Sequence, residues 1–381
     1  MFTQKPTQMY TKIFFGIQRG FQELGIHVEG LPMLLPHEAL TTFCQEMQAD
    51  VVLEMDRTRK QVPSLPKHIQ HISWMVDFNN PFCDGFQGSD LLYFFGKDWF
   101  TPQDQSRYQV GKIDWLPPGY CPHQFFYEER PWQWDFSFVG HIPNPWTEAD
   151  NARIVSHHQG REIRFAEAVQ LFQHFFLQRV EPPFTYMEPL HQQVVDDALH
   201  HLQQATGCHW QSLPQSLQHD LTMRSRRLYN RQRFIDHIFT VSQQVALFGT
   251  GGWSKWPHYA PYFGGYLGDI DRLRQVFQAS RINLHDGLPS HFRVFDCLAS
   301  GGFLFFRQPL RPLSQLGIQE LLTPGEDFIL VNDDNFAPLA RYWLDHPDQR
   351  RQFSQRTAEK VANNHTWKVR AERILHDLAH L

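Results

Sequence analysis

One stretch, Arg281 to Phe306 (RINLHDGLPSHFRVFDCLASGGFLFF), constrains the fold of this chain most strongly. It predicts an apolar strand over Ile282–Leu284, a loop over His285–Ser290 and a helix over His291–Ser300, followed by a second strand at Phe303–Phe306. Apolar residues recur at helical spacing inside the helix, and two glycines follow it, where a helix end favours residues that tolerate positive φ. Such a unit is typical of a parallel α/β sheet, and it turns the positive end of the helix toward the carboxyl edge of that sheet.

The carboxyl edge of an open α/β sheet is where anionic ligands bind, phosphates above all. Arg293 and Asp296 lie in the first turns of the predicted helix, and two interpretations fit them. They form an exposed i,i+3 ion pair contributing about 0.2–0.5 kcal/mol, or they bind a ligand. In the second case Arg293 holds a diphosphate as a multi-donor cation and Asp296 accepts hydrogen bonds from ribose hydroxyls. Spacing alone leaves both interpretations open.

The run RVFDCLASGGFLFF resembles the signature of the group 1 glycosyltransferases, in which an acidic residue precedes a small-residue helix end, a glycine and a strand. It is most similar to the CgeB-like, or spore-maturation-type, branch of that family. Other segments resemble the same branch in the same order along the chain: WMVDFNNP at 74–81, SFVG at 137–140, ALFGTGGW at 246–253, PGE at 324–326, Pro347, and HTW at 365–367 with Arg370. The resemblance therefore covers most of the chain.

The resemblance implies an α/β protein of GT-B architecture, with two Rossmann-like domains whose parallel sheets face a cleft and with extra helices in the second domain. We expect an acceptor-side domain over 1–134, a donor domain over 135–362 with a helical region at 147–239, and a final helix at 363–381 that returns to the first domain. The implied activity is transfer of a sugar from a nucleotide-diphosphate sugar, UDP- or GDP-linked, to an unidentified protein, glycan or small molecule. No DxD motif stands at a strand end, which favours transfer without a metal ion or other cofactor.

Candidate site residues follow partly from this resemblance and partly from the strand-end positions. By resemblance, the glycine-containing turns after two predicted strands border the donor pocket, and a strand end after residue 265 lies beside the base. Loop residues ahead of the central helix are positioned to donate hydrogen bonds to phosphates. The predicted donor-binding residues are Gly140, His141, Gly249, Gly251, Tyr266, His285, Ser290, His291, Arg293 and Asp296.

Two residues are predicted to act in catalysis. Arg293 would stabilise the leaving diphosphate together with the helix dipole. Asp77 ends the predicted strand HISWMVD, where ligand-facing side chains collect. It is either a turn residue ahead of Asn79–Pro81 or an acceptor-binding residue or general base, because an inverting sugar transfer needs a group that takes the acceptor's proton. Both interpretations of Asp77 stay open.

The first domain departs from the family pattern at its beginning. A helix is predicted over Tyr10–Leu24 and a strand over Ile26–Leu31, but residues 1–9 are mostly polar and contain Pro6. The apolar strand that should precede the helix is therefore short or missing. Either the sheet starts one strand short or the sequence begins later than in related proteins.

Composition excludes several classes of protein. The net charge of −5 gives no global attraction to nucleic acid or to anionic membranes. No apolar run reaches the roughly 18 residues of a spanning helix, and the first residues lack a signal-peptide core, so we expect a cytoplasmic protein. The 22 histidines and five cysteines form no HExxH or CxxC motif, which argues against a metal site and a disulfide framework.

Two further questions stay open at this stage. Five arginines cluster in the last predicted helix of the helical region, at 224, 226, 227, 231 and 233. They indicate a solvated helix face, with a basic cleft wall as the alternative. The other functions that fit are a non-catalytic nucleotide-sugar-binding protein and a sugar-nucleotide epimerase or hydrolase. The sequence assigns no oligomeric state.

Overall fold

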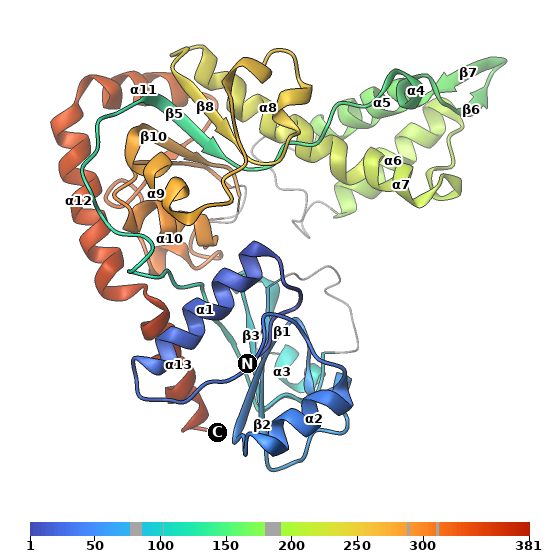
Figure 1. Ribbon diagram of the computed structural model, residues 1–381. Coiled ribbons are helices and arrows are strands. Elements are labelled where there is room, and N and C mark those ends of the chain that lie inside the picture. The colour runs from blue at the N-terminus through green and yellow to red at the C-terminus, as the bar shows by residue number, and fades with distance from the viewer. Residues whose placement is uncertain (77–85, 102, 180–191, 288–289, 310–311) are drawn as a thin grey trace.

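The computed structural model describes residues 1–76, 86–101, 103–179, 192–287, 290–309 and 312–381 of the chain. Two α/β domains are stacked one above the other, and a helical arm projects sideways from the second domain (Figure 1). Each domain is built around a parallel sheet. Asp77 lies outside the described residues, and its predicted role stays a prediction.

The first domain contains a four-stranded parallel sheet in the order β1-β2-β3-β4. Its strands are β1 (Val51–Met55), β2 (Gln70–Met75), β3 (Leu91–Phe94) and β4 (Lys112–Trp115). Helices α1 (Gln8–Gln22) and α13 (Trp367–Leu378) cover one face, and α2 (His37–Glu46) and α3 (Asp104–Tyr108) cover the other. Alternate strand residues face the two layers, so Leu53 packs in the core with α1 and Val52 in the core with α2.

A strand over Ile26–Leu31 was expected, and this expectation is wrong. The segment forms only an isolated parallel bridge, between Leu31 and Phe2, and Phe2 bridges in turn to Glu54. Phe2 N donates to Leu53 O at 2.9 Å, so a single residue occupies the position of the strand ahead of α1. Gly25 and Gly30 both adopt positive φ, which interrupts the extended backbone that a strand requires.

The second domain contains a six-stranded sheet in the order β12-β11-β10-β5-β8-β9, with every pair parallel. Its strands are β5 (Trp134–Val139), β8 (Val245–Phe248), β9 (Phe263–Gly265), β10 (Ser280–His285), β11 (Leu304–Arg307) and β12 (Ile329–Val331). Numbered within the domain, this is the Rossmann order 3-2-1-4-5-6. The order reverses between β5 and β10, which is where such sheets bind their ligands.

Helices cover both faces of the second sheet. Helices α9 (Ile270–Ala279) and α10 (Phe292–Ala299) pack on one face, and α8 (Ser225–Phe239) and α11 (Phe336–Asp345) pack on the other. The long helix α12 (Pro347–Asn364) contacts both α10 and α11 and runs down toward the first domain (Figure 1).

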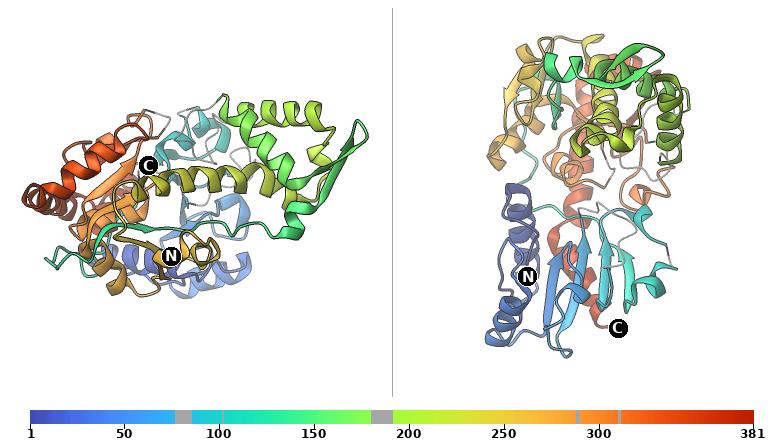
Figure 2. Two further views of the ribbon diagram at one scale, coloured as in Figure 1. Left: turned by 90° about the horizontal axis from the view of Figure 1, so that it is seen from above. Right: turned by 90° about the vertical axis from the view of Figure 1, so that its right-hand side faces the viewer.

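The helical arm spans most of residues 147–239 and has a hydrophobic core of its own. Its helices are α4 (Glu148–Ala152), α5 (Phe165–Leu177), α6 (Gln192–Thr206) and α7 (Gln215–His219), and α8 returns the chain to the sheet. The expectation of a helical region throughout 147–239 is wrong in part. Strands β6 (Ile154–His158) and β7 (Arg161–Arg164) form an antiparallel hairpin at its tip (Figure 2). Gln159 and Gly160 both adopt positive φ between them, as two-residue hairpin turns require.

The chain crosses between the domains twice, and the two crossings lie side by side. Tyr120 N donates to His365 O and Trp367 N donates to Tyr120 O, both at 3.1 Å. The Arg370 Nε donates to the carbonyls of Pro117 and Pro118 at 2.9 and 3.1 Å. On the basis of these crossings we propose 1–134, 135–362 and 363–381 as the domain limits.

The carboxyl edges of the two sheets meet at the start of α10. Trp74, near the end of β2, has its ring centroid 6.2 Å from that of Phe292, the first residue of α10. Phe95, which follows β3, stacks on the same ring at 5.1 Å. The N-terminus of α10 therefore lies between the domains.

Two further features concern the described ranges only. None of their helices is both long and apolar enough to cross a membrane. They also contain no group of three or more His, Cys, Asp or Glu side chains placed to hold a metal ion.

Candidate functional site

The candidate site lies where the strand order of the second sheet reverses. Three segments meet there: the turn after β5 (Gly140 and His141), the end of β10 (His285 and Asp286), and the first turns of α10. Rossmann sheets open a ligand crevice at this position, and a helix N-terminus there adds a positive dipole end. The structure thus brings seven of the predicted residues to one place: Gly140, His141, His285, Ser290, His291, Arg293 and Asp296.

Arg293 is the central cation of this site. Its Nη1 donates to the carbonyl of Val139 at the end of β5, and its Nε lies 3.4 Å from His291 Nδ1. Burial and the neighbouring Arg231 lower the pKa of Arg293 to about 10, so it is protonated at neutral pH. Within the described part of the chain, no carboxylate lies at ion-pair distance from Arg293. Its charge is therefore available for an anionic ligand.

His285 and His291 are neutral imidazole rings at this site. Burial, followed by the charge of Arg293, lowers the pKa of both rings well below its ordinary value. Gly287 N donates to His285 Nδ1 at 3.1 Å and Arg293 N donates to His291 Nδ1 at 3.2 Å. Since each Nδ1 accepts, the proton of each neutral ring is on Nε2. His285 Nε2 is buried and meets no acceptor among the residues described.

Asp296 is buried, with 2% of its surface exposed, and its Oδ2 accepts from Lys12 Nζ of α1. Its other oxygen, Oδ1, is buried and has no donor in the described ranges. Burial raises the pKa of this carboxyl, whereas Lys12 and Arg293 oppose that rise. The interpretation of Arg293 and Asp296 as an exposed ion pair is therefore wrong, because the first domain covers this turn of α10.

Arg231 and Asp286 also belong to the site. Arg231 is one of the five clustered arginines for which a basic cleft wall is the alternative interpretation, whereas Asp286 is not among the predicted site residues. Arg231 Nε lies 2.7 Å from Asp286 Oδ2, its Nη2 lies 3.0 Å from Oδ1, and its Nη1 donates to His141 O. Although burial alone raises the pKa of Asp286, Arg231 holds it below its ordinary value. The signal that points to Asp286 is its position directly after a buried strand, β10.

The arginines of α8 do not form a solvated face, so that expectation is wrong. Arg226 is 4% exposed, and the Arg231 side chain is 14% exposed. Burial, and then Arg231, lowers the pKa of Arg227 to about 10. Arg233 is the more exposed member and pairs with Asp333. Helix α8, the last helix of the arm, therefore places basic side chains at the carboxyl edge of the sheet.

The turns after β5 and β8 approach each other too closely for side chains. Gly140 N donates to Phe248 O at 2.8 Å, and a Cβ on Gly140 would lie 2.5 Å from the Phe138 ring and 3.2 Å from Arg293 Nη1. Gly249 has φ +147, and a Cβ there would lie 2.1 Å from Gly140 O. His141 Nδ1 and the Thr250 hydroxyl hydrogen-bond across the same gap. Glycine at 140 and 249 is thus what allows both turns to border the site.

Gly251 and Tyr266 lie farther from this centre. Gly251 is exposed, and a Cβ there would find only Ser254 Oγ, at 4.0 Å. Tyr266 follows β9, the edge strand two positions from β5, and is 59% exposed. Neither joins the cluster around Arg293.

The site holds more positive than negative charge. Among the described side chains, three cations (Lys12, Arg231 and Arg293) surround two carboxylates (Asp286 and Asp296), which leaves a net charge of +1. Buried charges are normally balanced, because an uncompensated one is costly to remove from water. The imbalance favours an anionic ligand, such as a diphosphate.

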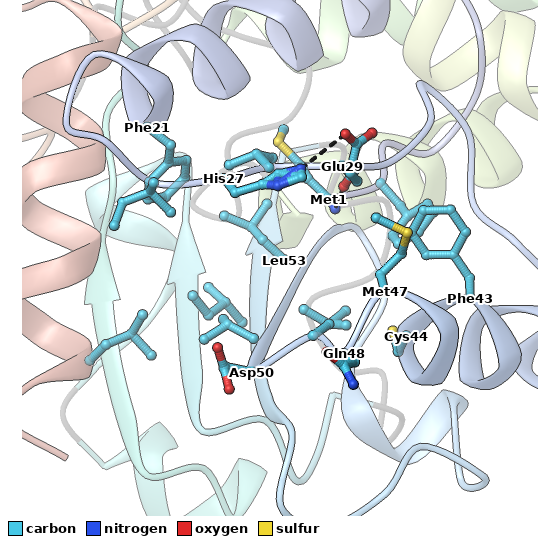
Figure 3. A pocket seen from close by; sticks show the side chains of 18 of the residues that line it. Met1, Phe21, His27, Glu29, Phe43, Cys44, Met47, Gln48, Asp50 and Leu53 are labelled. Atoms are coloured by element: carbon cyan, nitrogen blue, oxygen red, sulfur yellow. Dashed lines mark hydrogen bonds and ion pairs between the residues drawn. The ribbon is translucent and has the colours of Figure 1, made fainter.

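A separate apolar pocket of about 290 Å³ lies in the first domain (Figure 3). It is lined by side chains of α1, α2 and β1, among them Phe21, Cys44 and Leu53, and by Leu375 and Leu378 of α13. The pocket borders the beginning of β1, whereas the candidate site lies at the carboxyl ends of the strands. None of the predicted site residues lines it.

Comparison with known proteins bears on both the fold and the site. Residues 226–376 match the family model described as "Glycosyl transferase-like". This segment contains Arg231, Asp286 and Arg293 and omits the first domain. No protein of curated function matches the sequence.

Solved structures are similar over nearly the whole chain. HepE from Anabaena, in complex with UDP, is 11% identical with a TM-score of 0.50, and the match covers 100% of this chain and 99% of that one. A glycosyltransferase from Rickettsia africae is 9% identical (TM-score 0.45, covering 98% and 96%). Sucrose-phosphate synthase from Thermosynechococcus elongatus is 11% identical (TM-score 0.45, covering 92% and 81%). At such identities the likeness shows the fold alone, which is that of the GT-B glycosyltransferases.

Proposed function

We propose that this chain, which has a GT-B fold and a glycosyl transferase-like domain, transfers a sugar from a nucleotide-diphosphate sugar to an acceptor without a metal ion. One observation carries the proposal. Arg293 is a partly buried cation at the N-terminus of α10, at the reversal point of the sheet, and no carboxylate of the described residues lies at ion-pair distance from it. A diphosphate is the ligand that would balance it.

The proposed chemistry is electrostatic. As the glycosidic bond breaks, negative charge gathers on the leaving diphosphate. Arg293, the Nε2–H groups of His285 and His291, and the dipole of α10 would stabilise that charge. These groups are positioned in a partly buried site before the reaction, so little reorganisation is needed when the charge develops. Because side chains supply the positive charge, the proposal requires no metal.

The other predicted residues keep proposed roles. Asp296 would bind the ribose through Oδ1, which has no donor among the described residues, and Gly140 and Gly249 would let the backbone approach the donor. Tyr266 and Gly251 would border the base, a role that rests on resemblance alone. Asp77 remains the predicted acceptor-binding residue or general base.

UDP is the first nucleotide to test, because HepE has the same fold and was solved with UDP. GDP-linked donors are the alternative. The acceptor class stays open among proteins, glycans and small molecules.

The test is a thermal-shift and binding panel of UDP, GDP, dTDP, ADP and CMP, each with and without an attached sugar. A ligand at 100 times its Kd stabilises the folded protein by about 2.7 kcal/mol. We expect one nucleotide class to stabilise the wild-type protein and not Arg293→Ala. No stabilisation by any of them at millimolar concentration would overturn the proposal.

Product analysis with the selected donor then separates the competing functions. Sugar transferred to an added acceptor mixture supports a transferase. Free sugar, or an isomerised donor, formed without any acceptor indicates a hydrolase or an epimerase. Binding with neither product indicates a non-catalytic nucleotide-sugar-binding protein.

A further inference from the structure

Lys12 extends from the first domain into the candidate nucleotide site of the second. It lies on α1, and its ammonium group donates to Asp296 Oδ2 of α10, a residue 284 positions later in the chain. Its Nζ also lies 4.1 Å from the ring centroid of Phe125, in the segment that joins the domains. The side chain is 16% exposed, so the pair is largely shielded from water.

The two oxygens of Asp296 differ in their partners. Lys12 occupies Oδ2, whereas Oδ1 is buried and has no donor in the described chain. A buried acceptor without a donor is costly, and native structures rarely keep one. On the proposed function, on which this inference rests, the missing donor is a ribose hydroxyl of the bound nucleotide.

The ionised state of Asp296 depends on few neighbours. Lys12 of α1 and Arg293 of its own helix are the charged side chains that act on it within the described residues. The adjacent Cys297 thiol stays neutral, because burial raises its pKa well above the ordinary value. Burial raises the pKa of Asp296, and loss of either cation would raise it further.

We propose that Lys12 is a positioning residue of the nucleotide site, which fixes the Asp296 carboxylate through Oδ2 and leaves Oδ1 directed to the ribose. The first domain thereby becomes part of the nucleotide site. A nucleotide that binds Asp296 binds best when α1 lies against α10, so nucleotide binding is coupled to the contact between the domains.

The test compares Lys12→Met with wild type by titration calorimetry with UDP and 2′-deoxy-UDP at several pH values from 5.5 to 8. Wild type should bind UDP roughly tenfold more tightly than the deoxy form, the value of one hydrogen bond to a charged group. Lys12→Met should lose most of this discrimination. Its UDP affinity should fall further as the pH decreases, because a carboxyl with a raised pKa takes up a proton at a higher pH than one held by Lys12.

Two variants serve as controls. Lys5→Met removes an exposed lysine just ahead of the same helix and should leave both affinities unchanged. Lys12→Arg keeps the charge and should restore part of the discrimination. The melting temperature of each variant shows that it is folded.

The outcomes separate this inference from the proposed function. If wild type binds UDP and Lys12→Met binds both nucleotides as wild type does at every pH, the role of Lys12 is refuted and the nucleotide site stands. Tighter UDP binding by Lys12→Met would also refute it, since Lys12 would then compete with the nucleotide. If wild type binds none of the nucleotide panel, the proposed function itself fails.

Discussion

The Arg231 guanidinium binds both carboxylate oxygens of Asp286, with Nε 2.7 Å from Oδ2 and Nη2 3.0 Å from Oδ1. The same guanidinium donates through Nη1 to the carbonyl of His141. One side chain therefore joins α8, the end of β10 and the turn after β5. Because α8 is the last helix of the arm, this contact fixes the arm to the candidate donor site.

Removing one member of the Arg231–Asp286 pair should lower the free energy of unfolding strongly, whereas replacing both members should lower it little. Arg231→Met leaves the Asp286 side chain, which is 5% exposed, without its ion-pair partner, and we expect it to lower the free energy of unfolding by about 3–5 kcal/mol. In the double variant Arg231→Met/Asp286→Leu most of that loss should be recovered, but nucleotide binding should stay weak. Urea unfolding and UDP titration measure the two effects.

An exposed pair between the domains provides the matched control. Lys97 of the first domain pairs with Glu320 of the second, with side chains 35% and 55% exposed, whereas Arg231 and Asp286 both lie in the second domain. Lys97→Met should change the free energy of unfolding by less than about 1 kcal/mol. Strictly additive losses in the Arg231/Asp286 double variant would contradict the coupling.

Arg293→Met should abolish transfer in a protein that still folds. No described carboxylate is left without its cation, so the stability cost is mainly the lost donor to Val139 O, about 1–3 kcal/mol. Turnover should fall by a factor of about 10²–10³, as when a transition-state donor is removed from a preorganised site. Arg293→Lys keeps the positive charge but lacks the planar guanidinium with its several donors. Its turnover should lie between those of wild type and Arg293→Met. Near-wild-type turnover in Arg293→Met would refute the site assignment.

The glycines of the two predicted turns should differ in their tolerance of alanine. Gly140→Ala places a Cβ 2.5 Å from the Phe138 ring and 3.2 Å from Arg293 Nη1, so Arg293 must shift. Nucleotide affinity should decrease by at least about tenfold. Gly251→Ala meets only Ser254 Oγ at 4.0 Å and should lower affinity much less than Gly140→Ala does. Equal effects of both substitutions on UDP affinity would contradict this account.

The final helix should contribute acid-sensitive stability through Asp377. Tyr93 OH, Lys112 Nζ and Arg373 Nε all donate to this carboxylate. Although burial opposes them, these partners lower the pKa of Asp377 from 3.8 to about 2. A lowered folded-state pKa contributes stability that is present above the unfolded value and is lost as the pH falls toward the folded value. This stability should therefore disappear between about pH 4 and pH 2.

Acid titration of the free energy of unfolding checks this prediction. In Asp377→Asn the free energy of unfolding should depend less steeply on pH in that window, by an amount that corresponds to up to about one proton. Asp114 offers the comparison, because it is the more exposed acceptor of Arg373. An unchanged slope in Asp377→Asn would contradict the assignment.

The local sequence pattern correctly predicted the strand–helix–strand unit formed by β10, α10 and β11. β10, α10 and β11 lie where the stretch from Arg281 to Phe306 indicated, and Gly301 adopts φ +77 at the helix end. Strand alternation and helical spacing are properties of neighbouring residues, so a few turns of sequence encode them. The hairpin at Ile154–Arg164 and the bridge at Phe2 escaped prediction because each is short and depends on a partner segment.

The sequence by itself determined that Arg293 and Asp296 stand in the first turns of a helix at the carboxyl edge of a parallel sheet. Only the tertiary structure decided their partners. It placed Lys12 of α1 on Asp296, across 284 positions, and Arg231 of α8 on Asp286, across 55. Burial and charge pairing arise when helices from distant parts of the chain pack against that edge, and no spacing within the central stretch encodes such packing.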